Sequence, residues 1–158
     1  MNQRWIVLLV FVVAMELLTG CVSRNNSQEL LSVTELVGRM KQQIGSFSEM
    51  KQGDAEKLRK LYHIEASDVA EFALYTALSN VKADELAIIK LKDARDIEAI
   101  MDQVRQRVAT QSVKFKDYRP QEYYLIEKHV LLSKGPVIFF AISKDADRMK
   151  HAFDDALK

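Results

Sequence analysis

Apolar residues recur at intervals of three and four along three long segments of the chain. Residues 30–44, 93–111 and 145–157 each carry such a stripe, and the positions between the apolar ones are mostly charged or polar. This spacing places the apolar side chains on one face of a helix, so three amphipathic helices are predicted. Asp54 precedes a shorter stripe, which predicts an N-capped helix over residues 54–62. Residues 46–53 are expected to form a loop.

Four further segments have the patterns of β-strands. Residues 69–78 alternate between two faces, and residues 85–91 form a short, nearly continuous apolar run. Residues 123–132 and 137–142 flank Gly135-Pro136, a dipeptide typical of a hairpin turn. The last of these strands, VIFFAI, is apolar on both faces, which predicts a central strand that is covered on both sides.

The order of these elements, α-α-β-β-α-β-β-α, predicts one α+β domain over residues 30–158. Short connections between consecutive strands favour a four-stranded, mostly antiparallel sheet with helices packed on it. We expect helices 93–111 and 145–157 to pack on one face of the sheet and helix 30–44 to cover the other. If helix 30–44 covers only part of that face, an apolar groove remains there for a ligand or a partner.

Two segments of the predicted domain resemble each other. Residues 86–101 and 138–153 both pass from an apolar strand through Lys-Asp-Ala into an amphipathic helix. The two aspartates, Asp93 and Asp145, are each placed to cap the helix that follows. The sequence therefore leaves two interpretations open: a duplicated ββα unit, or the same capping solution used twice.

The first 21 residues differ from the rest of the chain. Arg4 gives a positive start, and Trp5 to Met15 is an unbroken apolar run. This run is too short to cross a bilayer comfortably, but it fits the core of a signal peptide. Leu18-Thr19-Gly20-Cys21 follows and resembles the bacterial lipobox. Glu16 departs from that pattern, and a carboxylate there is costly to bury and expected to slow processing.

A lipobox implies that residues 1–20 are a signal peptide, cleaved between Gly20 and Cys21, and that the Cys21 thiol carries a diacylglyceryl group. Two acyl chains suffice for stable anchoring. Residues 21–29 would then tether the domain at the outer face of the cytoplasmic membrane. Cys21 is the only cysteine, so no disulfide is expected. The alternative is a transmembrane anchor with an incidental cysteine.

Composition and charge narrow the function classes. The 158 residues carry 23 Lys and Arg against 22 Asp and Glu, which gives no electrostatic case for nucleic-acid binding. The three histidines stand apart, and the chain has no metal-binding, nucleophile-elbow or glycine-rich phosphate motif. No metal site, catalytic residue or cofactor beyond the covalent lipid is predicted. The basic and aromatic run KFKDYR at 114–119 suits anionic lipid headgroups or teichoic acids, or else a solvated turn.

Five short motifs follow one another in the mature chain. They are Leu61-Tyr62 before an acidic turn, Asp84-Glu85 with Lys90 on a strand, Arg107-x-x-x-Gln111 on the long helix, Phe115-x-x-Tyr118-x-Pro120 in the turn after it, and Lys134-Gly135 in the hairpin. Together with the lipobox they resemble the DUF4358 family of bacterial lipoproteins, over most of residues 29–158. Pro136 departs from that family's pattern. The resemblance implies an extracytoplasmic lipoprotein domain, found mainly in Gram-positive bacteria, and it implies no reaction.

Glu85, Lys90, Arg107, Tyr118 and Tyr123 are the candidate binding residues, because the resemblance touches four of the five. A purely structural interpretation gives each of these residues an ordinary role. Glu85 opens a strand, and Lys90 shields a strand edge. Arg107 lies on a solvated helix face, and Tyr118 packs its ring while its hydroxyl finds a backbone partner.

Three functions remain open at this point. The first is a non-catalytic, lipid-anchored binding or scaffold module with an envelope protein or polymer as its partner. The second is small-ligand capture between helix 30–44 and the sheet, in a cavity with a few converging polar groups. The third is an enzyme or accessory protein of cell-envelope polymer modification that uses Glu85, Lys90 and Tyr118. It requires these side chains to converge on one cleft.

Overall fold

The computed structural model describes residues 31–158, so the predicted signal peptide, Gly20, Cys21 and the tether lie outside the described residues. The described chain is α+β, with one five-stranded sheet in the order β1-β2-β3-β5-β4 and every neighbouring pair antiparallel. Its strands are β1 (Met50–Gly53), β2 (Val69–Ala77), β3 (Glu85–Leu91), β4 (Val130–Lys134) and β5 (Val137–Ile142). The prediction of a mostly antiparallel α+β sheet is confirmed, although the number of strands is five rather than four.

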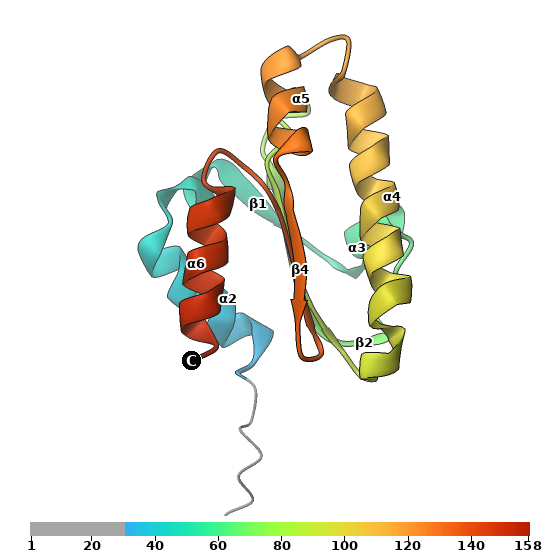
Figure 1. Ribbon diagram of the computed structural model, residues 1–158, viewed down its shortest axis with the longest axis vertical. Helices are drawn as coiled ribbons and strands as arrows, with labels where there is room; N and C mark the ends of the chain where they lie inside the picture. The colour runs from blue at the N-terminus through green and yellow to red at the C-terminus, as the bar shows by residue number, and fades with distance from the viewer. Residues whose placement is uncertain (1–30) are drawn as a thin grey trace, which may run out of the picture.

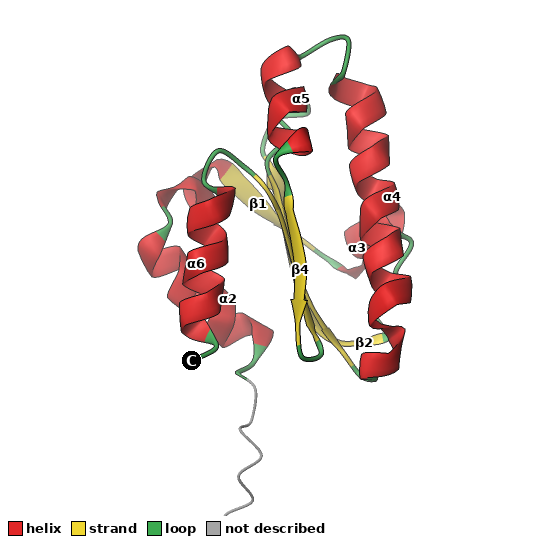
Figure 2. Ribbon diagram, in the orientation of Figure 1, coloured by secondary structure: helices red, strands yellow, loops and turns green. Residues whose placement is uncertain are grey.

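Helices cover both faces of this sheet (Figure 1, Figure 2). On one face lie α2 (Val33–Gln43) and α6 (Ala146–Ala156), and on the other lie α3 (Ala55–Tyr62), α4 (Ile97–Phe115) and α5 (Pro120–Glu127). Two short 3-10 helices, η2 (Gly45–Glu49) and η3 (Ala94–Asp96), precede β1 and α4. The sheet therefore separates two apolar clusters, one for each set of helices.

The central position predicted for VIFFAI is confirmed. β5 lies between β3 and β4, and all six of its residues are buried. Phe139 points into the cluster under α6, and its ring lies 4.9 Å from that of Phe153. Phe140, the next residue, points into the cluster under α3 and α4, where its ring lies 6.2 Å from that of Tyr62. Alternation along one strand thus supplies both cores.

The prediction that helices 93–111 and 145–157 share a face is wrong. α4 packs on the face opposite to α6, and α6 lies beside α2 instead. Arg39 of α2 donates to the Ala156 carbonyl, which ties these two helices together. The ββα duplication is not confirmed, and the two aspartates differ. Asp93 accepts a hydrogen bond from the Arg95 amide, whereas the Asp145 side chain makes no capping bond.

The prediction of a single strand over residues 123–132 is also wrong. Residues 120–127 are helix α5, and only residues 130–134 are strand β4. Pro120 starts the helix at a position where its missing amide hydrogen costs nothing. Buried Glu122 fixes the helix by accepting hydrogen bonds from the Ala83 amide and from Lys82. These long-range bonds override the strand-like composition of the segment.

The fifth strand, β1, lies within residues 46–53, for which the sequence predicts a loop. Its four residues, MKQG, pair at the sheet edge with β2, from Met50 opposite Ala77 to Gly53 opposite Leu74. A Cβ atom on Gly53 would lie 2.9 Å from Leu74 Cδ2 and 3.0 Å from Lys57 Cδ, so this edge approaches too closely for a side chain. Polar edge strands this short carry little sequence signal.

No helix within residues 31–158 is both long and apolar enough to cross a membrane.

The contact at Gly53 predicts opposite effects for two glycine substitutions. Gly53→Ala pushes against the fully buried Leu74, so we expect a loss of about 1–3 kcal/mol in the free energy of unfolding. Gly38 is exposed on α2, and a Cβ atom added there would have no neighbour within 4 Å, so Gly38→Ala should gain roughly 0.5–1 kcal/mol. Urea denaturation of both variants measures the difference, and equal effects would contradict the close approach at Gly53.

Candidate functional site

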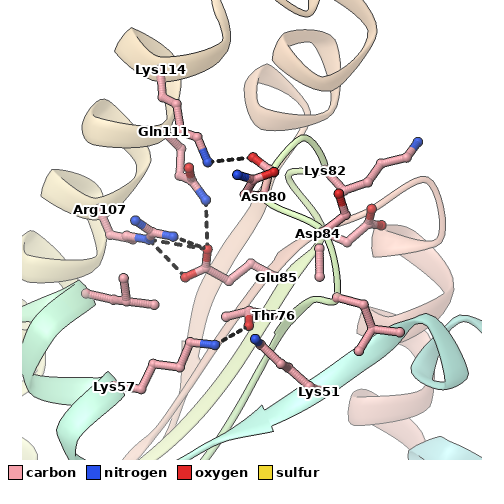
Figure 3. A pocket seen from close by; sticks show the side chains of 14 residues that line it. Lys51, Lys57, Thr76, Asn80, Lys82, Asp84, Glu85, Arg107, Gln111 and Lys114 are labelled. Atoms are coloured by element: carbon pink, nitrogen blue, oxygen red, sulfur yellow. Dashed lines mark hydrogen bonds and ion pairs between the residues drawn. The ribbon is translucent and has the colours of Figure 1, made fainter.

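A pocket of about 650 Å³ opens at the end of the sheet where β2 finishes and β3 begins (Figure 3). β1 and α3 form one side of this pocket, and the last turns of α4 form the other. Its charged and polar lining consists of Lys51, Lys57, Thr76, Ser79, Asn80, Lys82, Asp84, Glu85, Arg107, Gln111 and Lys114. Five of these side chains are basic and two are acidic, so the pocket is electropositive although the whole chain is nearly neutral.

Glu85 lies at the back of the pocket with only 1% of its surface exposed. Arg107 faces it with a forked contact, Nη2 to Oε2 at 2.7 Å and Nε to Oε1 at 3.0 Å. Gln111 Nε2 donates to Oε2 at 3.0 Å, and the Tyr62 hydroxyl donates to Oε1 at 2.5 Å. We call these four residues the Glu85 network. A buried carboxylate needs such donors, because burial without them is very costly.

Each member of the Glu85 network comes from a position that local structure fixes. Glu85 is the first residue of β3, and Tyr62 is the last residue of α3. The backbone turns immediately after Tyr62, because His63 adopts a left-handed conformation with φ 59°. Arg107 and Gln111 are four residues apart on α4 and therefore share one helix face. The network thus joins α3, α4 and β3 through one carboxylate.

The network also changes the ionisation of its members. Burial, followed by the neighbouring Glu85 carboxylate, raises the pKa of Tyr62 well above its ordinary value, so this phenol stays protonated and donates. Burial acts to lower the pKa of Arg107, but its hydrogen bonds to Glu85 outweigh burial and leave that pKa raised. Burial also raises the pKa of Asp84, beside the network. The network therefore holds a fixed arginine–carboxylate ion pair.

The lysines around the network are less compensated. Lys57 Nζ donates to Thr76 Oγ1 at 2.6 Å, and Lys114 Nζ donates to the Asn80 carbonyl at 2.8 Å. Neither Lys51 nor Lys57 forms an ion pair with a carboxylate anywhere in residues 31–158. Burial, and then the charge of Lys51, lowers the pKa of Lys57. Lys51 and Lys57 therefore lie close enough to repel each other, and at Lys57 the charges of Glu85 and Asp54 act against this repulsion.

The structure brings two of the five candidate residues together. Glu85 and Arg107 form the ion pair, and the interpretation that Arg107 lies on a solvated face is wrong, since only 13% of its side chain is exposed. Lys90 lies near the opposite end of β3 and donates to Glu71 at 2.9 Å. Because β3 lies between β2 and β5, Lys90 does not shield a strand edge.

The two candidate tyrosines lie outside the pocket. Tyr118 follows α4 and is 71% exposed, so its ring is not packed as expected. Tyr123 lies on α5, where a hydrogen bond to Glu127 raises the pKa of its hydroxyl. Glu85, Lys90 and Tyr118 therefore do not converge on one cleft. Among the residues that the structure describes, no three His, Cys, Asp or Glu side chains gather into a metal site.

Sequence reasoning misses most of the pocket. Gln111 is visible only as part of the Arg107-x-x-x-Gln111 motif, and Tyr62 only as part of the Leu61-Tyr62 pair before an acidic turn. Lys51, Lys57 and Thr76 come from three elements, one of which has the sequence pattern of a loop. Their convergence follows from the pairing of β1 with β2, in which Lys51 lies opposite Thr76.

The Glu85 network predicts a large loss of stability on removing its cation. Arg107→Ala leaves a buried carboxylate without its ion-pair partner, so we expect the free energy of unfolding to fall by about 3–5 kcal/mol. Arg105 lies on the same helix, but it is half-exposed and pairs with surface acids. Arg105→Ala should therefore change the free energy of unfolding by about 0.5 kcal/mol or less. Urea denaturation compares the two, and a small Arg107 effect would argue against a buried ion pair.

Comparison with known proteins gives one match. The model of a family described as a domain of unknown function, DUF4358, matches residues 43–143. Neither the curated proteins nor the solved structures contain a match. The matched residues include β1, the Glu85 network and every basic residue that lines the pocket. Since the match covers more than half of the chain, this protein belongs to the DUF4358 family.

Proposed function

We propose that this protein is a lipid-anchored, extracytoplasmic, non-catalytic binding module, and that it binds an anionic ligand in the pocket beside the Glu85 network. The observation that carries the proposal is the pair Lys51 and Lys57, which line the pocket without a carboxylate partner in residues 31–158. Pockets of a few hundred Å³ with a small number of placed polar groups are typical of small-ligand sites. An anion supplies the charge that the two lysines lack.

Binding explains the Glu85 network better than catalysis does. A general base needs a carboxylate that can reach the substrate and accept a proton. Both Glu85 oxygens already accept hydrogen bonds, and the side chain is almost fully buried. This supports a structural role for Glu85, and it argues against the enzyme hypothesis that joined Glu85 to Lys90 and Tyr118.

The alternative ligand site beneath α2 has less support. Val33, Leu36 and Met40 of this helix are at most 1% exposed and pack into the cluster with α6 and the sheet. A filled apolar contact leaves no reason to place a ligand there. The small-ligand hypothesis therefore moves to the opposite face of the sheet.

The cellular address rests on the lipobox. Cys21 is expected to be acylated and to hold the domain at the outer face of the cytoplasmic membrane, with a partner among envelope polymers or proteins. Growing the bacterium with a palmitate analogue should label the wild-type protein and leave Cys21→Ala unlabelled and uncleaved. Label that persists in Cys21→Ala would contradict the anchor, and so would a wild-type protein found in the cytosol with its leader intact.

The proposed function predicts that an anion binds in the pocket and that Lys51 contributes to its affinity. The full chain, purified in a neutral detergent, is titrated calorimetrically with acetate, citrate, inorganic phosphate and pyrophosphate. At least one anion should bind, and Lys51→Ala should weaken it about tenfold, the size of one lost charge-assisted hydrogen bond. Lys60→Ala is the matched control, because Lys60 is exposed on α3 outside the pocket. If none of the four anions binds, the proposed function is wrong.

A further inference from the structure

Several donors that remain after the internal hydrogen bonds are counted lie together in one corner of the pocket. Lys51 on β1, Lys57 on α3 and Thr76 on β2 form this group, which we call the lysine corner. In Figure 3 both ammonium groups reach toward Thr76. Thr76 Oγ1 accepts from Lys57, so its own hydrogen is left to donate, and Lys57 keeps two further hydrogens. The corner therefore offers several donors from three rigid elements.

The kind of donor selects the kind of anion. Planar carboxylates are matched best by the fork of an arginine. Among the described residues that line the pocket, Arg107 is the only arginine, and its fork is already occupied by Glu85. What remains are ammonium point charges and a hydroxyl, which suit the tetrahedral oxygens of a phosphate group. The Glu85 network therefore occupies the one arginine of the lining that could hold a carboxylate ligand by two parallel hydrogen bonds.

The charge of the lysine corner also favours a phosphate over a carboxylate. Two lysines carry a charge of +2, and no carboxylate of the described residues pairs with either. A phosphomonoester carries about −1.5 to −2 at pH 7, whereas a carboxylate or a phosphodiester carries about −1. Only the monoester compensates both lysines and relieves the repulsion between them. The charge balance thus favours a terminal phosphate over an internal one.

The pocket is larger than the corner. It extends past the Glu85 network to Lys114 and Asn80 on the far side, with Leu61 and Leu78 in its wall. Its volume of about 650 Å³ is that of a drug-sized ligand site. A phosphate in the corner thus leaves room for the rest of a small organic molecule, held by polar groups and a little apolar surface.

We propose that the lysine corner binds the phosphate of a phosphomonoester, and that the rest of the ligand lies along the pocket toward Lys114. This inference rests on the proposed function and names the ligand class of the same site. Two sources share this chemistry, a free phosphorylated small molecule and the phosphomonoester headgroup of a lipid.

The test compares anions of matched size on the full chain in neutral detergent. Glycerol phosphate should bind about tenfold or more tightly than dimethyl phosphate or glycerate. Lys51→Ala and Lys57→Ala should each weaken glycerol phosphate about tenfold, and Lys60→Ala should leave it unchanged. Lys51 is exposed on the edge strand, so its substitution leaves the fold intact even if Lys57→Ala does not. Micelles that carry phosphatidic acid compete with glycerol phosphate only if lipid headgroups are also ligands.

The pH dependence gives a second readout. Affinity should rise as pH passes the second phosphate pKa near 6, because the dianion forms there. It should fall again in alkaline solution, at a pH below that expected for an ordinary lysine, because the pKa of Lys57 is lowered in the free protein. Lys57 experiences the charges of Lys51 on β1, Glu85 on β3, Asp54 at the start of α3 and Arg107 on α4.

The outcomes separate this inference from the proposed function. In one outcome, glycerate or dimethyl phosphate binds as tightly as glycerol phosphate, and Lys51→Ala weakens that binding. This result would support the proposed binding function and contradict the inference that the ligand is a phosphomonoester. An affinity for glycerol phosphate that stays constant between pH 5 and 7.5 would also contradict the claim that the dianion is the form that binds. If neither glycerol phosphate nor any other anion binds, both proposals fail.

Discussion

The buried ion pair between Glu85 and Arg107 is the interaction on which the pocket side of the molecule depends. A carboxylate with 1% exposure is unfavourable unless donors surround it. Here the donors come from α3 and α4, so these helices must take fixed positions against β3 to satisfy it. Apolar burial alone would hold the same helices with less orientational preference, since it is non-directional. The ion pair therefore fixes the positions of α3 and α4 on a face of the sheet that Leu58, Val104 and Phe140 already stabilise by apolar packing.

The same ion pair also defines what the pocket can hold. Glu85 raises the pKa of Lys57 and Arg107 lowers it, so the ion pair compensates the charge of Lys57 less than Glu85 alone would. By engaging its fork, Arg107 also becomes unable to grip a planar carboxylate. The neighbouring Lys51 and Lys57 form no ion pair with a carboxylate of the described residues, and burial lowers the pKa of Lys57, which makes its charge more costly. In the proposed binding role, one pair of side chains thus serves both the stability of the fold and the selection of the anion.

The sequence predicts the parts of this structure that depend on local pattern. β3 and β5 have the expected bounds, and α2 and α6 differ from expectation by a few residues, because their apolar positions have a clear period. β1 and α5 escape such reasoning because their conformations depend on distant partners, β2 for the polar MKQG strand and Ala83 and Lys82 for Glu122. The burial of Arg107 also cannot be predicted from local sequence, because it depends on a distant partner. Its partner Glu85 lies 22 residues away, and no periodicity marks that contact.

The two ends of β2 carry different polar groups. At one end Glu71 accepts from the Val33 amide and from Lys90, which fixes the start of α2, the first helix of the described chain. At the other end of β2, on the opposite face, Thr76 belongs to the lysine corner. The proposed anchor at Cys21 would act through the chain that leads into α2, and a tether of about eight residues would span roughly 25–30 Å at full extension. The start of α2, where the proposed anchor joins the described residues, and the lysine corner thus lie toward opposite ends of β2, so an attachment there leaves the pocket uncovered.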